Sequence, residues 1–166
     1  MSFRILLAGL ALSVVCAPAE SATIYRTHLS HGVANCQPAL PAFDGNIRKR
    51  PKGIGNEGTS AAFVTCDFEH LPNALNSVSW AIVYARNNGA ASAEFTCTLV
   101  QAFGATSYGA NVVKTATIAA GGSGDIGFGA SDNGGDALTL PAISCKLSPG
   151  VEIYGTALAF FEEIGN

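Results

Sequence analysis

Three carboxylate side chains and one amide gather in a glycine-rich stretch of this 166-residue sequence: Asp125, Asp132, Asn133 and Asp136. Oxygen ligands clustered on flexible loops are what calcium sites use. Residues 121–125 fall one residue short of the calcium β-roll repeat, and residues 132–136 lack the alternation of an EF-hand loop. The four residues are therefore candidate calcium ligands, with turn-forming Asp and Asn side chains as the alternative interpretation. No other cofactor is indicated.

Positive charge is concentrated in a run of basic residues, Arg48, Lys49, Arg50 and Lys52. Such a run can contact polyanions, for example acidic polysaccharides or lipid headgroups, or else forms a solvated loop. The chain has 9 Lys and Arg against 12 Asp and Glu, a net charge of −3. Because phosphate binding needs a general excess of bases or a basic stripe interleaved with aromatics, nucleic acid is not a favoured partner.

Motifs for nucleophilic catalysis or zinc chemistry do not emerge from the sequence. The G-x-S-x-G elbow fails at Ser123, because Asp125 stands where the second glycine is needed. His28 and His31 are three residues apart, which in a strand puts them on opposite faces and prevents them from chelating one ion. The sequence therefore favours a protein that is not an enzyme. The alternative is a secreted hydrolase of wall or polysaccharide that uses Asp125 and Asp136.

An export signal is indicated at residues 1–19. Arg4 precedes an uncharged apolar run from Ile5 to Val15, and small residues follow at Ala17-x-Ala19. The apolar run is too short to span a bilayer, so we expect cleavage before Glu20 and no transmembrane anchor. Cleavage after Ser21 is the close alternative. In either case the product is secreted or periplasmic.

Cysteine usage agrees with that compartment. Of the five cysteines, Cys16 leaves with the signal, and loss of Arg4 lowers the net charge from −3 to −4. An even number then remains in an oxidising environment, which predicts two disulfides. Sequence alone does not separate the three possible pairings. The preferred one is Cys36–Cys66 with Cys97–Cys145.

Residues 20–166 are expected to form a single domain. From about residue 60, β-branched and aromatic residues alternate with small or polar ones between turns rich in Gly, Asn and Pro. Before residue 60 a strand is expected only at 23–29, and residues 71–75 fit one helical turn. About eight strands without long helices predict an all-β antiparallel sandwich, immunoglobulin-like or jelly-roll-like.

Local patterns refine this expectation. Val78, Trp80, Ile82 and Tyr84 share one strand face, which predicts a core position for Trp80 rather than a sugar-stacking one. Residues 87–89 predict a hairpin between the strands at 77–86 and 94–103. Residues 148–150 predict a tight turn that closes a second hairpin, between 142–147 and 151–162.

Spacing of the cysteine segments carries one resemblance. With Cys36-Gln37, Val64-Thr65-Cys66 and two distant cysteines, the chain resembles a loose family of small secreted bacterial proteins of unassigned function. The resemblance implies an exported two-disulfide β-sandwich and brings no catalytic residues. The immunoglobulin pattern is a rival template, because Trp80 follows Cys66 by fourteen residues. It would pair Cys66 with Cys145 and Cys36 with Cys97, although Ile143 stands where the tyrosine corner needs Tyr.

These observations favour a non-catalytic extracellular or envelope module that binds a polysaccharide, a protein or another copy of itself. The alternative is a subunit of a secreted filament or coat that assembles through an exposed sheet edge, with the strand at 151–162 as the candidate edge.

Overall fold

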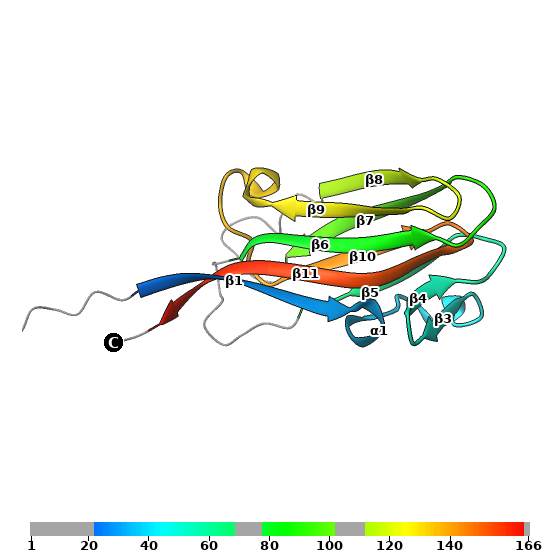
Figure 1. Cartoon of the computed structure of the whole chain (residues 1–166), viewed down its shortest axis with the longest axis horizontal. Helices are drawn as coiled ribbons and strands as arrows, with labels where there is room; N and C mark the ends of the chain where they lie inside the picture. The colour runs from blue at the N-terminus through cyan, green and yellow to red at the C-terminus, as the bar shows by residue number, and fades with distance from the viewer. Residues whose placement is uncertain (1–21, 69–77, 102–111, 165–166) are drawn as a thin grey trace, which may run out of the picture.

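The computed structural model describes residues 22–68, 78–101 and 112–164, to which every structural statement below refers. The expected signal at residues 1–19 and the helical turn at 71–75 lie outside the described residues. Eleven strands form two antiparallel sheets packed face to face (Figure 1). The predicted all-β sandwich is confirmed.

Sheet A contains six strands. Its hydrogen-bonded order is β3 (Ile47–Arg50), β4 (Gly53–Asn56), β11 (Val151–Ile164), β6 (Val78–Asn87) and β9 (Ser123–Gly129). The sixth strand, β1 (Ala22–His31), pairs with residues 155–164 of β11, beyond the point where β4 pairs with residues 152–153. Strands β1 and β4 therefore follow one another along the same side of β11.

Sheet B contains five strands. Their order is β2 (Cys36–Pro38), β5 (Ala62–Cys66), β10 (Pro141–Leu147), β7 (Ala93–Gln101) and β8 (Val112–Ile118). The helical elements are short: α1 (Gly32–Asn35) and the 3₁₀ turns η1 (Pro41–Phe43) and η2 (Ala130–Asn133). None of the helices in the described residues has the length and apolar character needed to cross a membrane.

Both disulfides lie within sheet B and not between the sheets. Cys36 faces Cys66 across the β2–β5 pair, and Cys97 faces Cys145 across the β7–β10 pair. The preferred pairing is confirmed, and the pairing required by the immunoglobulin template is wrong. All four half-cystines are at most 1% exposed and contribute to the one hydrophobic cluster between the sheets.

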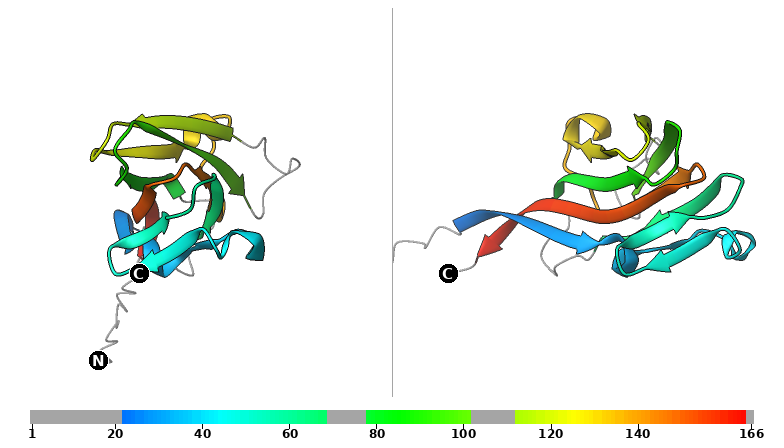
Figure 2. Two further views of the ribbon diagram at one scale, coloured as in Figure 1. Left: turned by 90° about the vertical axis from the view of Figure 1, so that its right-hand side faces the viewer. Right: turned by 45° about the vertical axis from the view of Figure 1, so that its right-hand side comes forward.

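Two predicted hairpins are wrong, because consecutive strands lie in different sheets. Strand β6 belongs to sheet A and β7 to sheet B, and β10 and β11 are divided in the same way (Figure 2). The Ser148–Gly150 segment does form a tight turn, in which the Val151 amide donates to the Ser148 carbonyl and Gly150 has φ +84°. The turn residues thus mark a change of direction at a corner and leave the pairing partner undetermined.

Two buried asparagines hold corners of this kind. Asn87 ends β6, and its Nδ2 donates to the carbonyls of Ala91 and Ile118 while Oδ1 accepts from the Gly89 amide. Asn56 ends β4 and makes the same set of bonds, to Ser60, Leu147 and Gly58. In both cases an Asn-x-Gly sequence satisfies the backbone groups that the chain exposes on leaving sheet A.

Strands β2, β3 and β4 lie before residue 60, where the sequence predicts a strand only at 23–29. They are three or four residues long, and β3 and β4 are rich in Arg, Lys and Gly, which strand propensity disfavours. Gly53 is buried against the Ile153 carbonyl and the Glu152 side chain, so a Cβ at this position would collide with β11. Close packing on β11, and not local preference, produces this part of the sheet.

Strand β11 is paired on both sides at residues 152–153 and 155–160, so the predicted role of this strand as a sheet edge is wrong. Only its last four residues, 161–164, lie beyond β6, and they pair with β1 alone. The β1–β11 pair extends past the rest of the sandwich as a two-stranded ribbon (Figure 1).

Candidate functional site

The outer face of β6 carries large side chains between rows of very small ones. Trp80 lies opposite Gly129 on one side and Ala159 on the other, and Ile82 lies between Gly127 and Ala157. Ala157 and Ala159 are completely buried although they point away from the core. Their burial shows that the neighbouring large side chains cover them.

Trp80 is on this outer face, half-buried, so its predicted position in the core is wrong. The cause is an irregularity in the β6–β11 pairing between Trp80 and Val78, which reverses the alternation of β6. Val78 is fully buried in the core, whereas Trp80, Ile82 and Tyr84 face outward. Bulges of this kind commonly redirect a side chain near a functional surface.

The indole of Trp80 lies across the sheet. Its Nε1 donates a 2.6 Å hydrogen bond to the Tyr25 hydroxyl on β1, two strands away. To reach that hydroxyl the ring must pass over β11, where Ala159 has no exposed surface. Tyr25 is fixed in turn by an edge-to-face contact with Phe161, at a centroid distance of 5.3 Å. Trp80 is half-buried, so part of its side chain stays exposed to solvent.

A second aromatic group lies further along β6. The rings of Tyr84 and Tyr154 stack with centroids 6.1 Å apart. Tyr154 occupies another irregularity, where the pairing of β11 with β6 shifts between Ile153 and Gly155. These rings line an open groove of about 460 Å³ together with Leu29, Ser30 and His31 of β1.

Polar side chains border the two tyrosines. Asp125 of β9 pairs with Tyr84, and His31 of β1 pairs with Gly155, so both belong to the cross-strand row that contains Tyr84. The row crosses the four strands β9, β6, β11 and β1, so about 14 Å separates its two ends. Asp125 and His31 stand at these ends and are exposed. We call the surface formed by Tyr25, Trp80, Tyr84, Tyr154 and the groove beside them the aromatic face.

The candidate calcium residues are placed apart. Asp125 lies near the start of β9, whereas Asp132 and Asn133 belong to η2 after its end and Asp136 follows η2. Among the described residues, no group of three or more His, Cys, Asp or Glu side chains is arranged to hold a metal ion. Calcium binding stays a prediction, and so does catalysis by Asp125 with Asp136.

Asp132 and Asn133 have structural partners. The Asp132 carboxylate accepts bonds from Lys114 Nζ and from the Gly129 amide, at 2.8 and 2.9 Å. Burial disfavours its charged form, but these two bonds outweigh that effect and hold the pKa of Asp132 below its usual value. Asn133 donates to the carbonyls of Asp136 and Ala137 and accepts from Gln101.

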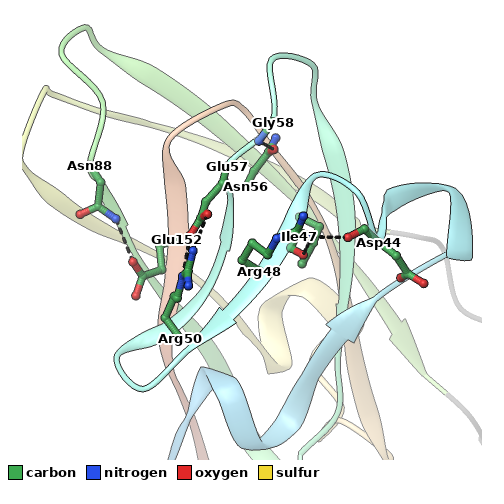
Figure 3. Close-up of polar contacts among 9 residues, drawn as sticks. All are labelled: Asp44, Ile47, Arg48, Arg50, Asn56, Glu57, Gly58, Asn88 and Glu152. Carbon is green, nitrogen blue, oxygen red and sulfur yellow. Dashed lines mark hydrogen bonds and ion pairs between the residues drawn. The ribbon is translucent and has the colours of Figure 1, made fainter.

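The basic run forms β3 and the turn into β4 (Figure 3). Arg50 makes a bidentate ion pair with Glu57, with both contacts at 2.8 Å. This bond lowers the pKa of Glu57 and raises that of Arg50. Arg48 donates to the carbonyls of Asp44 and Ile47, and Lys49 to that of Val33.

A hollow of about 280 Å³ lies between Arg50 and Glu152. Glu152 is 8% exposed and accepts from Arg86 and Asn88. Acidic groups therefore line the same hollow as Arg50, and a uniformly basic surface does not form there. Contact with polyanions by Arg48, Lys49, Arg50 and Lys52 stays a prediction.

The histidine pair behaves as the spacing indicates. His28 and His31 are on one strand, β1, in opposite orientations, and His28 Nε2 is 2.9 Å from Ser30 Oγ. Sequence reasoning missed Tyr25, Tyr84 and Tyr154 as surface groups. The alternation of Gly155, Ala157 and Ala159 in β11 was the available signal, since such small residues leave room for large neighbours on the same face.

Comparisons with known proteins show no family. No protein-family model matches the chain, and no curated protein matches its sequence. A structure from disulfide-linked pili of Bacillus endospore appendages is 12% identical with a TM-score of 0.39, over 94% of this chain and 100% of that one. The coat protein of Tobacco streak virus gives 12% and 0.39, over 92% and 94%.

A xylan-binding module is 7% identical with a TM-score of 0.37, over 85% of this chain and 97% of that one. Likenesses at this level support no inference about ligand or assembly. The function must be argued from the geometry of this chain.

Proposed function

We propose that this protein is an exported, non-catalytic binding module that holds a polysaccharide chain against its aromatic face. The observation that carries the proposal is the position of Trp80, whose indole lies over Ala159 and is tied to Tyr25 by a 2.6 Å hydrogen bond. A flat ring fixed in this way is a preformed stacking surface. The two disulfides suit an oxidising compartment, which agrees with export.

Sugar rings suit such a surface because their C–H faces are apolar while their hydroxyls are polar. An aromatic ring covers the apolar face, and a few polar groups at its border hydrogen-bond the hydroxyls and select the sugar. Asp125 and His31 stand at the border of the Tyr84 row, where they are exposed to solvent. The aromatic face therefore offers both kinds of contact.

The spacing of the rings favours a chain over a single sugar. Trp80 and Tyr84 are four residues apart on one strand, a separation of about 13 Å. The groove beside Tyr84 and Tyr154 is open to solvent and is bounded by β1. A polymer can lie along β6 and contact both aromatic groups, whereas a monosaccharide reaches one of them.

The test is a pull-down of the purified protein with insoluble xylan, cellulose, chitin and peptidoglycan, followed by titration with soluble oligosaccharides of the polymer that binds. Because Trp80 is the only tryptophan, its fluorescence reports binding directly. We expect Trp80→Ala to weaken binding at least tenfold and Tyr84→Ala to weaken it several-fold. Phe63→Ala is the matched control, because Phe63 is an exposed aromatic residue, 40% exposed, on sheet B.

Failure of the wild-type protein to bind any of these polymers would sink the proposal, and so would binding that survives the two substitutions combined. Each pull-down supernatant is also assayed for new reducing ends. Release of soluble sugar that is lost in Asp125→Asn or Asp136→Asn would replace the proposal with the hydrolase alternative.

A further inference from the structure

The edge strands of the two sheets differ in how they are protected against pairing with another chain. Strand β2 has three residues and contains Pro38, β3 has four and carries Arg48, Lys49 and Arg50, and β9 is rich in glycine. Short length, proline and charge are usual means by which a sheet edge is protected, and glycine weakens a strand. Strand β8 has seven residues, and Lys114 secures it to β9 by donating to the Gly127 carbonyl.

Strand β1 has none of these protections along most of its length. It has ten residues, ATIYRTHLSH, with neither proline nor glycine and with one permanently charged side chain, Arg26, which pairs with Glu162 at 2.8 Å. It pairs with β11 alone, so its other edge faces no described strand. Leu29, Tyr25 and Ile24 are 70%, 49% and 37% exposed. A long edge strand that carries exposed apolar side chains is a template for another strand.

We propose that a second copy of this chain pairs with this edge, β1 against β1 in antiparallel orientation, about a two-fold axis that passes through Thr27. A two-fold axis makes the contact self-complementary and closed, and it joins two six-stranded sheets into one. This inference goes beyond the proposed function, because it concerns self-association through the edge of sheet A. Tyr25 and Leu29 belong both to that edge and to the aromatic face.

The register follows from length and charge. Opposite residues in an antiparallel pair share a face, so each two-fold register is centred on one residue. The strand from 22 to 31 overlaps itself most when that residue is Arg26 or Thr27. Centring on Arg26 would set two arginines directly opposite one another, which is destabilising.

Centring on Thr27 gives stabilising pairs instead. It places Thr27 opposite its own copy and Tyr25 opposite Leu29 twice, and threonine pairs and aromatic–aliphatic pairs each stabilise a sheet. Both apolar groups are exposed in the single chain. At His31 the chain leaves the strand and enters α1, which ends the paired segment.

The pairing has a consequence for the aromatic face. A two-fold axis between antiparallel strands of one sheet runs perpendicular to that sheet, so the outer faces of both copies point the same way. The dimer then presents two aromatic faces on one continuous surface. A polymer long enough to reach both would gain in avidity without any new contact within either copy.

The test is sedimentation velocity of the exported, disulfide-bonded protein over a wide concentration range. We expect a dimer that Thr27→Lys converts to monomer, because two lysines would meet at the axis. Thr117→Lys is the matched control, because Thr117 is an exposed threonine of a strand in the other sheet, and it should leave the dimer intact.

A cysteine at the axis checks the register. Under mild oxidation Thr27→Cys should form an intermolecular disulfide, whereas Thr23→Cys, on the same strand and face, should not, because Thr23 lies opposite His31 of the second copy. A wild-type protein that stays monomeric overturns the proposal. Equal cross-linking of the two cysteine variants, or assemblies larger than a dimer that Thr27→Lys leaves unchanged, also overturns it.

The outcome is separable from that of the proposed function. Thr27→Lys leaves Trp80, Tyr84 and Tyr154 in place, so the monomer should bind a short oligosaccharide with unchanged affinity. It should bind an insoluble polymer more weakly than the dimer does. Loss of the dimer with retained oligosaccharide binding supports both proposals, whereas a dimer that binds no polysaccharide leaves only this one standing.

Discussion

The outer faces of the two sheets differ in composition. That of sheet A carries the aromatic side chains, laid over glycine and alanine. That of sheet B is dominated by polar side chains: Thr65, Glu94, Thr96, Thr98, Thr115, Thr117, Ser144 and Lys146. Two of its threonines, Thr96 and Thr115, hydrogen-bond one another through their hydroxyls at 2.8 Å. Its exposed apolar groups, Phe63, Val100 and Val113, lie on three different strands.

The difference extends to what holds each sheet together. Sheet B contains both disulfides, each between neighbouring strands and directed into the core. Sheet A has no cross-link among the described residues and is organised around β11, which pairs with β1, β4 and β6. Covalent stabilisation is thus separated from the surface that we assign to binding. A change at a disulfide of sheet B can therefore lower the stability of the fold while it leaves the site on sheet A in place.

The largest effect is expected on removal of a disulfide, which tests this separation. Replacing Cys97 and Cys145 with alanine should lower the free energy of unfolding by up to about 4 kcal/mol, because a long loop in the unfolded chain is no longer closed. Replacing Cys36 and Cys66 should cost a similar amount, since the loops have 48 and 30 residues of separation. Urea denaturation measures both.

In each pair the polysaccharide affinity, measured well below the unfolding midpoint, should stay within twofold of the wild-type value. A folded variant that has lost binding would show that sheet B does contribute to the site. A loss of less than about 1 kcal/mol would show instead that closing the loop adds little to the stability of the fold.

A smaller effect is expected at a corner that joins the sheets. Asn87 is 1% exposed and its side chain closes the β6 corner through bonds to Ala91, Ile118 and Gly89. Asn87→Ala leaves those backbone groups without partners and should cost about 1–3 kcal/mol. Asn88→Ala, at an exposed neighbour whose side chain donates to Glu152, is the control and should cost well under half as much, because Glu152 keeps its bonds from Arg86. Equal costs in thermal denaturation would contradict the role of Asn87.

The sequence was informative wherever local pattern and tertiary packing agree. Alternation located β5 to β11 and β1, and the export signal fixed the number of cysteines that pair. It left three pairings open, of which the structure shows the preferred one. The sequence failed where packing on a neighbour decides the outcome. The short strands β3 and β4 exist because Gly53 permits close contact with β11, which no local propensity reveals.

The candidate site was harder to predict than the fold. A strict period of two places Trp80 on the same face as Val78, and a single irregularity in the pairing of β6 with β11 separates them. Such an irregularity depends on how two distant strands meet, so the alternation of one strand cannot contain it. The corners had the same difficulty, because a turn signal at residues 148–150 does not say in which sheet the next strand pairs.

A more delicate comparison concerns how Trp80 is held on sheet A. Tyr25→Phe removes the hydroxyl that accepts from Nε1 while keeping the contact between the ring and Phe161. We expect a loss of about 1 kcal/mol in stability, a change in tryptophan emission and several-fold weaker polysaccharide binding, because the indole is no longer fixed over Ala159. Tyr84→Phe is the control and should leave the emission of Trp80 unchanged. Identical spectra for Tyr25→Phe and the wild type would argue against a preformed platform.

The smallest effect is expected where the edge strands β8 and β9 of the two sheets meet. There Lys114 of β8 pairs with the carboxylate of Asp132, which lies in η2 after β9. The lowered pKa of Asp132 means that the unfolded chain binds its proton more tightly than the folded protein does. The pair therefore stabilises the fold fully above the unfolded-state pKa of about 4, and its contribution declines as pH falls through the lower folded-state value. Because Lys114 is 37% exposed, the contribution should stay below about 1 kcal/mol. In urea denaturation, the stability difference between the wild type and Asp132→Asn should be constant from pH 5 to 7 and shrink in stronger acid. A difference that grows with acidity would mean that Asp132 contributes to stability by something other than this ion pair.

Addition of a chelator at neutral pH completes the experiment. If Asp132 binds calcium and not only Lys114, the melting temperature of the wild type will fall while that of Asp132→Asn stays unchanged.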